Sequence, residues 1–367
     1  MKRLMLATTA LFALSGVTVA AADISISGHV RFHYDTWSDD KKDTGTSGAN
    51  NNKMSGDLQL WVMGETVTDS GLTYGAAVRM RDGDAGASEI GSDTNVDRRY
   101  LTIADDWGKI TLGRQWAPSY SMSLASDWRG TIAYNGAENV LRNVKAADAT
   151  AANPVRSVPL MTGTYLSAST SGRQDKVIYE TPDISGFKAG VSMSDAGSSS
   201  KANSTEFALQ YGMTAFGDGS FKVGYAAASQ AEKDGANDST KTDKSEIGAE
   251  VSFGDLTASI VQLSQKDTPK KADASNKVEK QSGQELEVAY NATDSLTVNL
   301  VYFTSKLTES MNHKDDKFKS TGVGAKYTIA PGLYTSLGYQ KFDYTDADTK
   351  TNNNGGNAIR VRVHASF

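Results

Sequence analysis

Arginine side chains alternate with apolar ones in several segments of this 367-residue chain. In LTYGAAVRMR (72–81), Arg79 and Arg81 alternate with apolar residues, and IRVRVHASF (359–367) repeats the pattern at the C-terminus. Successive side chains of a β-strand point to opposite faces, so each segment would carry guanidinium groups on one face and apolar groups on the other. Several guanidinium groups on a face in contact with water would attract anions and repel cations.

Histidine is the other residue type here that could do chemistry. His29, His33 and His364 alternate with apolar residues in the terminal segments, and a hydrolase would need one of them beside a serine and an orienting polar partner. Polar lining of a wetted face is the favoured interpretation of these histidines. With 4 His and 0 Cys, the chain leaves little room for a metal site and excludes disulfide and thiolate chemistry. We expect no enzymatic activity and no cofactor.

The remaining charged residues indicate little further binding chemistry. The acidic segments RDGDAGASEIGSD (81–93) and DYTDADTK (343–350) could bind Ca²⁺ through carboxylates and carbonyls, although solvated loops are the favoured interpretation. The formal charge is 38 − 43 = −5, which is not basic enough for a nucleic-acid footprint. We therefore expect no nucleic-acid partner.

The alternation of apolar and polar residues recurs along the chain and predicts about sixteen β-strands. The predicted strands lie at 23–35, 59–66, 72–81, 98–105, 109–115, 175–181, 187–194, 206–213, 220–228, 246–253, 256–263, 285–291, 296–303, 322–329, 333–340 and 359–367. Because each strand has one apolar and one polar face, together they predict a sheet with one apolar and one wetted surface.

The connections between these strands alternate in length. Turns such as VTDSG (67–71) and APG (330–332) carry the Gly, Asp and Pro of tight reversals. Segments such as SDDKKDTGTSGANNNK (38–53) and QKDTPKKADASNKVEKQ (265–281) are too polar to pack. This predicts an all-β fold, a transmembrane up-and-down antiparallel β-barrel of 16 strands whose outer apolar face contacts lipid. A soluble β-sandwich or lectin fits the number of strands less well.

The N-terminus indicates export. MKRLMLATTALFALSGVTVAAAD begins with two basic residues, continues as an apolar run and ends on three alanines before Asp23, as a secretory signal peptide does. We expect residues 1–22 to be removed and residues 23–367 to form a barrel in a bacterial outer membrane. A retained helical anchor is disfavoured, and no later segment reaches the roughly 18 continuous apolar residues that a transmembrane helix needs.

One connection differs from the others. Residues 117–172 form the longest segment without a predicted strand, and their apolar residues include Trp128, Tyr134 and Leu141. Such a loop should not lie in water, so we expect it to fold into the lumen, which sixteen strands otherwise leave open, and to narrow it. An extracellular mini-domain, packed on itself or on a neighbouring subunit, is the alternative.

Two hairpins beside this loop resemble those of a known family. ADDWGKITLGRQ (104–115) resembles the strand-turn-strand that ends in Gly-Arg-Gln before the inward-folded third loop of Gram-negative general porins. GRQDKVIYETPDISGFKAGVSMS (172–194) is similar to that family's next hairpin, and Phe367 on an alternating strand resembles its C-terminal signature. The resemblance implies a homotrimer of 16-stranded barrels through which ions and small hydrophilic solutes cross the outer membrane by diffusion. It also implies that the barrel assembly machinery reads Phe367.

The resemblance further implies a constriction where carboxylates of the third loop face arginines of the barrel wall. Strand parity directs Arg79 and Arg81 inward and favours Arg98 over Arg99 as the inward residue of that pair. Arg173 matches the family's wall arginine after the loop. The loop supplies 3 acids, Asp127, Glu138 and Asp148, against 4 bases, Arg129, Arg142, Lys145 and Arg156. Because this balance departs from acidic loops, we expect a pore with weak or anion-leaning charge selectivity.

Other residues have expected places as well. Parity directs Arg114 outward, and in the family this Gly-Arg arginine lies near the subunit contact. On the C-terminal strand, Arg360, Arg362 and His364 are expected to meet water in the lumen, while the opposite face meets lipid. Trp61, inward by parity, is a hint of a substrate-specific channel, which is the first alternative to general diffusion. A non-conducting adhesion or structural barrel with a plugged lumen is the second.

Overall fold

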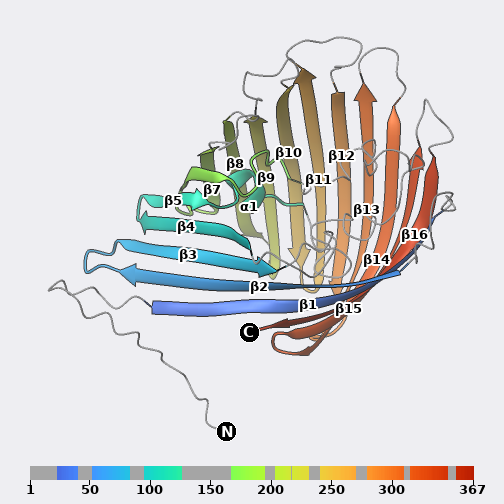
Figure 1. Cartoon of the computed structure of the whole chain (residues 1–367), viewed down its shortest axis with the longest axis horizontal. Helices are drawn as coiled ribbons and strands as arrows, with labels where there is room; N and C mark the ends of the chain where they lie inside the picture. The colour runs from blue at the N-terminus through green and yellow to red at the C-terminus, as the bar shows by residue number, and fades with distance from the viewer. Residues whose placement is uncertain are drawn as a thin grey trace, which may run out of the picture.

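The fold is one closed β-barrel (Figure 1). The computed structural model of the chain describes residues 23–39, 52–82, 95–125, 167–194, 203–215, 217–230, 240–269, 279–309, 315–345 and 353–367. Within these residues, sixteen antiparallel strands each pair with the next along the chain, and β1 pairs with β16 to close the ring. The predicted all-β fold of 16 strands is confirmed. In the same residues, no helix is long and apolar enough to cross a membrane.

The strands vary in length around the ring. The shortest, β5 to β7, have 7, 6 and 8 residues, whereas β1 has 17, so the wall is lowest beside the predicted inserted loop. The strands are β1 (Asp23–Asp39), β2 (Asn52–Val67), β3 (Thr73–Asp82), β4 (Asn95–Asp105), β5 (Gly108–Arg114), β6 (Asp175–Glu180), β7 (Phe187–Ser194), β8 (Ser204–Ala215), β9 (Gly219–Gln230), β10 (Thr240–Phe253), β11 (Leu256–Pro269), β12 (Glu279–Asn291), β13 (Leu296–Glu309), β14 (Asp316–Ala330), β15 (Leu333–Thr345) and β16 (Asn354–Ser366). A short helix, α1 (Pro118–Ser121), follows β5.

Alternation decides the face that each side chain takes. On β16, Val361 and Val363 are 38% and 44% exposed, whereas Arg360 and Arg362 are 0% and 1% exposed. Large apolar side chains are exposed in the same way on the outside of other strands, among them Val191, Ile247, Leu286, Leu300, Val323 and Leu337. An apolar surface of this extent is unfavourable in water and suits lipid.

The two ends of the described chain close the barrel against each other. Gly28 and Phe367 exchange two backbone hydrogen bonds, each 3.0 Å from nitrogen to oxygen. A Cβ on residue 28 would lie 2.4 Å from the Gln59 carbonyl oxygen and 3.0 Å from the Phe367 ring, so only glycine allows this approach. Since β1 pairs with both β2 and β16, neither terminal strand is left as an open edge.

Candidate functional site

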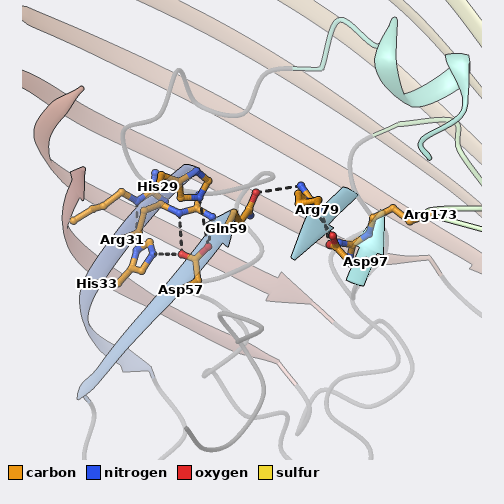
Figure 2. A network of polar contacts seen from close by, with 9 residues as sticks. His29, Arg31, His33, Asp57, Gln59, Arg79, Asp97 and Arg173 are labelled. Atoms are coloured by element: carbon orange, nitrogen blue, oxygen red, sulfur yellow. Dashed lines mark hydrogen bonds and ion pairs between the residues drawn. The ribbon is translucent and has the colours of Figure 1, made fainter. Parts of the chain in front are cut away.

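Three of the four predicted wall arginines meet on the inner face of β3 and β4. Figure 2 shows two of them, Arg79 and Arg173, on either side of Asp97. Arg79 donates from Nε to Asp97 Oδ1 at 2.7 Å and from Nη1 to Gln59 Oε1 at 3.1 Å. Arg173, which comes from the end of the inserted loop, also forms an ion pair with Asp97. One carboxylate therefore bridges an arginine of the wall and an arginine of the loop.

A β-bulge brings Asp97 to this face. Arg98 lies opposite Arg79, but Val96 lies opposite Met80, so Asp97 is the extra residue in the register between β3 and β4. A bulge lets two consecutive side chains turn to the same side of a sheet. Asp97 and Arg98 thus both reach inner-face partners. Arg99 points outward, half exposed, with its Nη2 3.2 Å from the Asp175 carboxylate, so Arg98 is the inward residue of the pair.

Two tryptophans hold the arginine side chains in place. The guanidinium carbons of Arg79 and Arg98 each lie 5.3 Å from the centre of the Trp61 ring. Arg98 also lies 5.7 Å from the Trp116 ring, and Arg173 lies 5.4 Å from it. These distances are within the range of cation–π attraction. We call the six residues the wall cluster: Trp61, Arg79, Asp97, Arg98, Trp116 and Arg173.

Arg81, the fourth predicted wall arginine, is buried two residues further along β3. Its register partner on β2 is Gln59, so it lies beside the wall cluster on the same face. The structure thus places all four arginines on the inner side, and Arg79, Arg98 and Arg173 share partners.

The two ends of the inserted loop are fixed to the neighbouring inner wall, from β6 to β10. We call them the loop stems, residues 117–125 and 167–173. Glu206 on β8 accepts hydrogen bonds from Ser119 Oγ and from the Ser171 backbone N–H, the latter at 2.8 Å. Glu246 on β10 accepts from Ser123 Oγ at 2.8 Å and from the Leu124 N–H at 3.1 Å. Both carboxylates therefore bind the loop stems to the lumenal face of the barrel wall.

A glycine makes room for the first loop stem. A Cβ on Gly190 of β7 would lie 2.6 Å from Pro118 of α1. Lys176 of β6 joins the second stem by donating from Nζ to Ser171 Oγ at 2.6 Å and to the Gly172 carbonyl at 2.7 Å. The wall from β6 to β10 is thus shaped to receive the loop stems.

A second polar group lies where β1, β2 and β16 meet. Arg31 donates from Nε to Asp57 Oδ1 at 2.8 Å, and the nearest nitrogens of His29 and His33 lie 3.7 Å from the same carboxylate (Figure 2). These histidines alternate inward as predicted. His33 Nδ1 also accepts a hydrogen bond from Arg362 at 3.4 Å.

The prediction that Arg360 and Arg362 meet water in the lumen is wrong. They are 0% and 1% exposed, and Arg360 donates from Nε and Nη2 to Asp35 at 2.6 and 2.5 Å. The prediction treated β16 alone, whereas the barrel closure puts Asp35 of β1 directly opposite Arg360. Arg360 therefore holds the seam of the barrel together by ion pairing with Asp35, and Arg362 does so by its hydrogen bond to His33.

Several predicted features lie outside the described residues. They are the loop acids Asp127, Glu138 and Asp148, the loop bases Arg129, Arg142, Lys145 and Arg156, the N-terminal segment 1–22, and most of the two candidate calcium loops. Arg114 is described, and it lies opposite the outward Arg99 and Asp175 in the register. In the described part of the chain, no group of three or more His, Cys, Asp or Glu is arranged to hold a metal ion.

Sequence analysis missed the acids that position these features. Asp97, Glu206 and Glu246 were not singled out, although Glu206 and Glu246 occupy inward positions in strands that were predicted. An acid on the inner face of a strand was a usable signal for these two. Asp97 had no such signal, because its inward direction depends on the bulge.

A closed barrel of sixteen strands, apolar outside and charged inside, defines an outer-membrane channel protein. The family comparison agrees. A family model described as Gram-negative porin matches residues 7–347, and the chain belongs to this family. Comparison with curated proteins found no match.

Solved structures share the fold at low sequence identity. OmpT, an outer membrane protein of Vibrio cholerae, is 14% identical with a TM-score of 0.66, over 96% of this chain and 99% of that one. An anion-selective porin from Comamonas acidovorans is 16% identical with a TM-score of 0.65, over 94% and 100%. A mutant of the Rh. blastica porin is 20% identical with a TM-score of 0.55, also over 94% and 100%.

Proposed function

We propose that this porin is a water-filled channel for passive diffusion of ions and small hydrophilic solutes, with weak charge selectivity. The observation that carries the proposal is the wall cluster. Four inward arginines, Arg79, Arg81, Arg98 and Arg173, gather around one inward acid, Asp97, so the wall cluster together with Arg81 carries 4 − 1 = +3. The loop acids Asp127, Glu138 and Asp148 would face these arginines across a constriction formed by residues 117–172.

The loop stems support the placement of that constriction. Glu206 and Glu246 bind the two stems to the inner wall from β8 to β10, and Arg173 ties the second stem to Asp97 on β4. Both ends of the segment are thus held on the inner side of the barrel wall. The segment between the stems would therefore narrow the channel instead of forming a mini-domain outside the barrel.

Elementary electrostatics limits the selectivity. Two unit charges 10 Å apart in bulk water interact by about 0.4 kcal/mol, and walls of low dielectric raise this several-fold. Such energies bias the passage of ions by small factors and do not block it. The excess of arginines favours anions.

We further propose a homotrimer whose subunit contact includes β4 to β6. Arg99, Arg114 and Asp175 lie on the outer face there. A charged side chain facing lipid costs about 2 to 4 kcal/mol near the bilayer midplane, and a neighbouring subunit would cover it. OmpT of Vibrio cholerae is known in a trimer form. Export through the signal peptide 1–22 and recognition of Phe367 by the assembly machinery complete the proposal, with no enzymatic activity and no nucleic-acid partner.

A substrate-specific channel is the second candidate. Trp61 and Trp116 lie on the inner side with arginines between them, and such aromatic rings could bind one class of solute. Solute flux into liposomes separates the candidates, since diffusion rises linearly with solute concentration and a specific channel saturates. A barrel with no flux and no conductance would be neither.

A further inference from the structure

Seven lysines lie on the outer face of one sector of the barrel, near the strand ends that lead into residues 231–239, 270–278, 310–314 and 346–352. Each lies an even number of residues from an exposed apolar residue of its own strand, as Lys266 does from Ile260 and Lys341 from Tyr339. We call them the lysine belt: Lys241 on β10, Lys266 on β11, Lys280 on β12, Lys306 on β13, Lys317 and Lys319 on β14, and Lys341 on β15.

The lysines lie at one height above the apolar surface, although they occupy different rows of the register. The row of Lys341 passes through Ile260 on β11, so the belt moves 266 − 260 = 6 residues over four strands, or 1.5 per strand. Strands tilted by 35–45° and spaced about 4.8 Å apart require a shift of about 1.0 to 1.4 residues per strand to stay level. The observed shift is slightly above this range, so the belt runs roughly along the plane of a membrane.

The apolar surface has an upper edge of its own in this sector. The outermost exposed apolar residue is Ile247 on β10 and Tyr339 on β15. The register row that contains Tyr339 reaches β10 at Val251, four residues from Ile247. The edge thus shifts in the same direction as the belt. The belt lies beyond this edge, two residues from it on β15 (Tyr339 to Lys341) and six on β10 (Ile247 to Lys241). Lipid headgroups lie on this side of a lipid-facing surface.

The belt carries an excess of positive charge that few carboxylates of the described residues offset. Lys241 lies 3.0 Å from Asp243, and Lys306 lies 2.6 Å from Asp315, whose carboxyl pKa this lysine holds below its usual range. With Asp343 included, the outward charges sum to 7 − 3 = +4 in a chain whose formal charge is −5. At the opposite end, Lys109, Lys188 and Lys222 take inward positions, and each lies within 3.5 Å of a carboxylate.

A hollow of about 420 Å³ lies within the belt. Ser245, Ser264 and Ser282 lie side by side in one register row across β10 to β12. Because their side chains are small, they form the base of the hollow. Its rim includes Lys266, Lys280 and Lys306. Ammonium groups around hydroxyl donors are the chemistry that holds a phosphate group.

We propose that the lysine belt binds phosphate-bearing lipids of the outer leaflet, with one headgroup phosphate seated in the serine-floored hollow. Long connections of outer-membrane barrels face the cell exterior, so the belt would meet the outer leaflet. The sector also lies eight strands around the ring from β4 and β5, on the side opposite the proposed subunit contact, where lipid is the neighbour.

Binding of diphosphorylated lipid A to the detergent-purified full-length protein, followed by native mass spectrometry, tests this proposal. The triple substitution K266Q/K280Q/K306Q removes the rim of the hollow. Each lysine near an anionic lipid surface contributes about fivefold in affinity, so the triple variant should bind roughly a hundredfold more weakly. The matched control, K109Q/K188Q/K222Q, removes the same charge at the opposite end and should bind like the parent.

Further arms distinguish the possible outcomes. K266R/K280R/K306R keeps the charge and should bind within about threefold of the parent. An unchanged single-channel conductance of the two belt variants, and discrete conductance steps of the control variant, would show that each is folded and still a pore. Lipid A without its phosphates should bind at least tenfold more weakly than the diphosphorylated form. Equal binding of dephosphorylated lipid, equal loss in both triple variants, or inorganic pyrophosphate binding as tightly as the lipid would overturn the proposal.

Discussion

Asp97 is the residue whose replacement tests the wall cluster most sharply. Its carboxylate pairs with Arg79 and Arg173, and Asp97→Asn keeps its shape while removing its charge. The charge of the wall cluster together with Arg81 then rises from 4 − 1 = +3 to +4. We expect the channel to become more anion-selective.

The size of the change follows from the geometry. An ion passing about 10 Å from residue 97 gains or loses about 0.4 kcal/mol in bulk water, and up to about 1 kcal/mol between walls of low dielectric. The permeability of the anion should therefore rise, and that of the cation should fall, by about two- to fivefold each, so their ratio should rise by about four- to twenty-five-fold. Reversal potentials across a KCl gradient in a planar bilayer measure this ratio directly.

A matched control exists on the other side of the same wall. Asp175 pairs with Arg99 on the outer face, at 3.2 Å, so Asp175→Asn makes the same charge change away from the lumen. Its permeability ratio should stay at the parent value. An unchanged ratio in the Asp97 variant, a shift toward cations, or equal shifts in both variants would refute the lumenal placement of Asp97.

Three further changes test other contacts. Replacing Glu206 and Glu246 together by Gln weakens the hydrogen bonds to both loop stems, so single-channel conductance should rise or become noisier. The control Glu250→Gln, near the short-turn end of the barrel, should leave the conductance unchanged. Arg360→Ala leaves Asp35 buried without its partner; such a loss costs about 3 to 5 kcal/mol, and a thermal unfolding midpoint equal to the parent's would contradict the seam pairing. Deleting Phe367 removes the two backbone hydrogen bonds to Gly28 and the expected assembly signal, so insertion into the outer membrane should slow; assembly at the parent rate, measured by pulse-chase, would count against that role.

Strand alternation was sufficient to predict the fold and the facing of most residues. Arg79, Arg81 and Arg98 take the predicted inner face because the neighbouring apolar residues must face lipid, and one residue of shift would reverse every side chain. A closed barrel of sixteen strands also requires β1 to pair with β16, since an open edge is unfavourable.

The features that could not be predicted depend on contacts between distant segments. The inward turn of Asp97 arises from a bulge in pairing with β3, and the burial of Arg360 arises from Asp35, 325 residues away in the chain. The predicted strands were also too short. β10 begins at Thr240, whereas the prediction began at residue 246. Both faces of the strand are polar between these positions, so the alternation of apolar and polar residues disappears there. That same extension carries part of the lysine belt.

Single-channel recording of the purified protein in a planar bilayer tests the central proposal most directly. A water-filled diffusion channel predicts discrete conductance steps, current that rises linearly with salt concentration, and an anion-to-cation permeability ratio modestly above one. An absence of steps, current that saturates with one solute, or a permeability ratio above about ten in either direction would contradict a weakly selective pore.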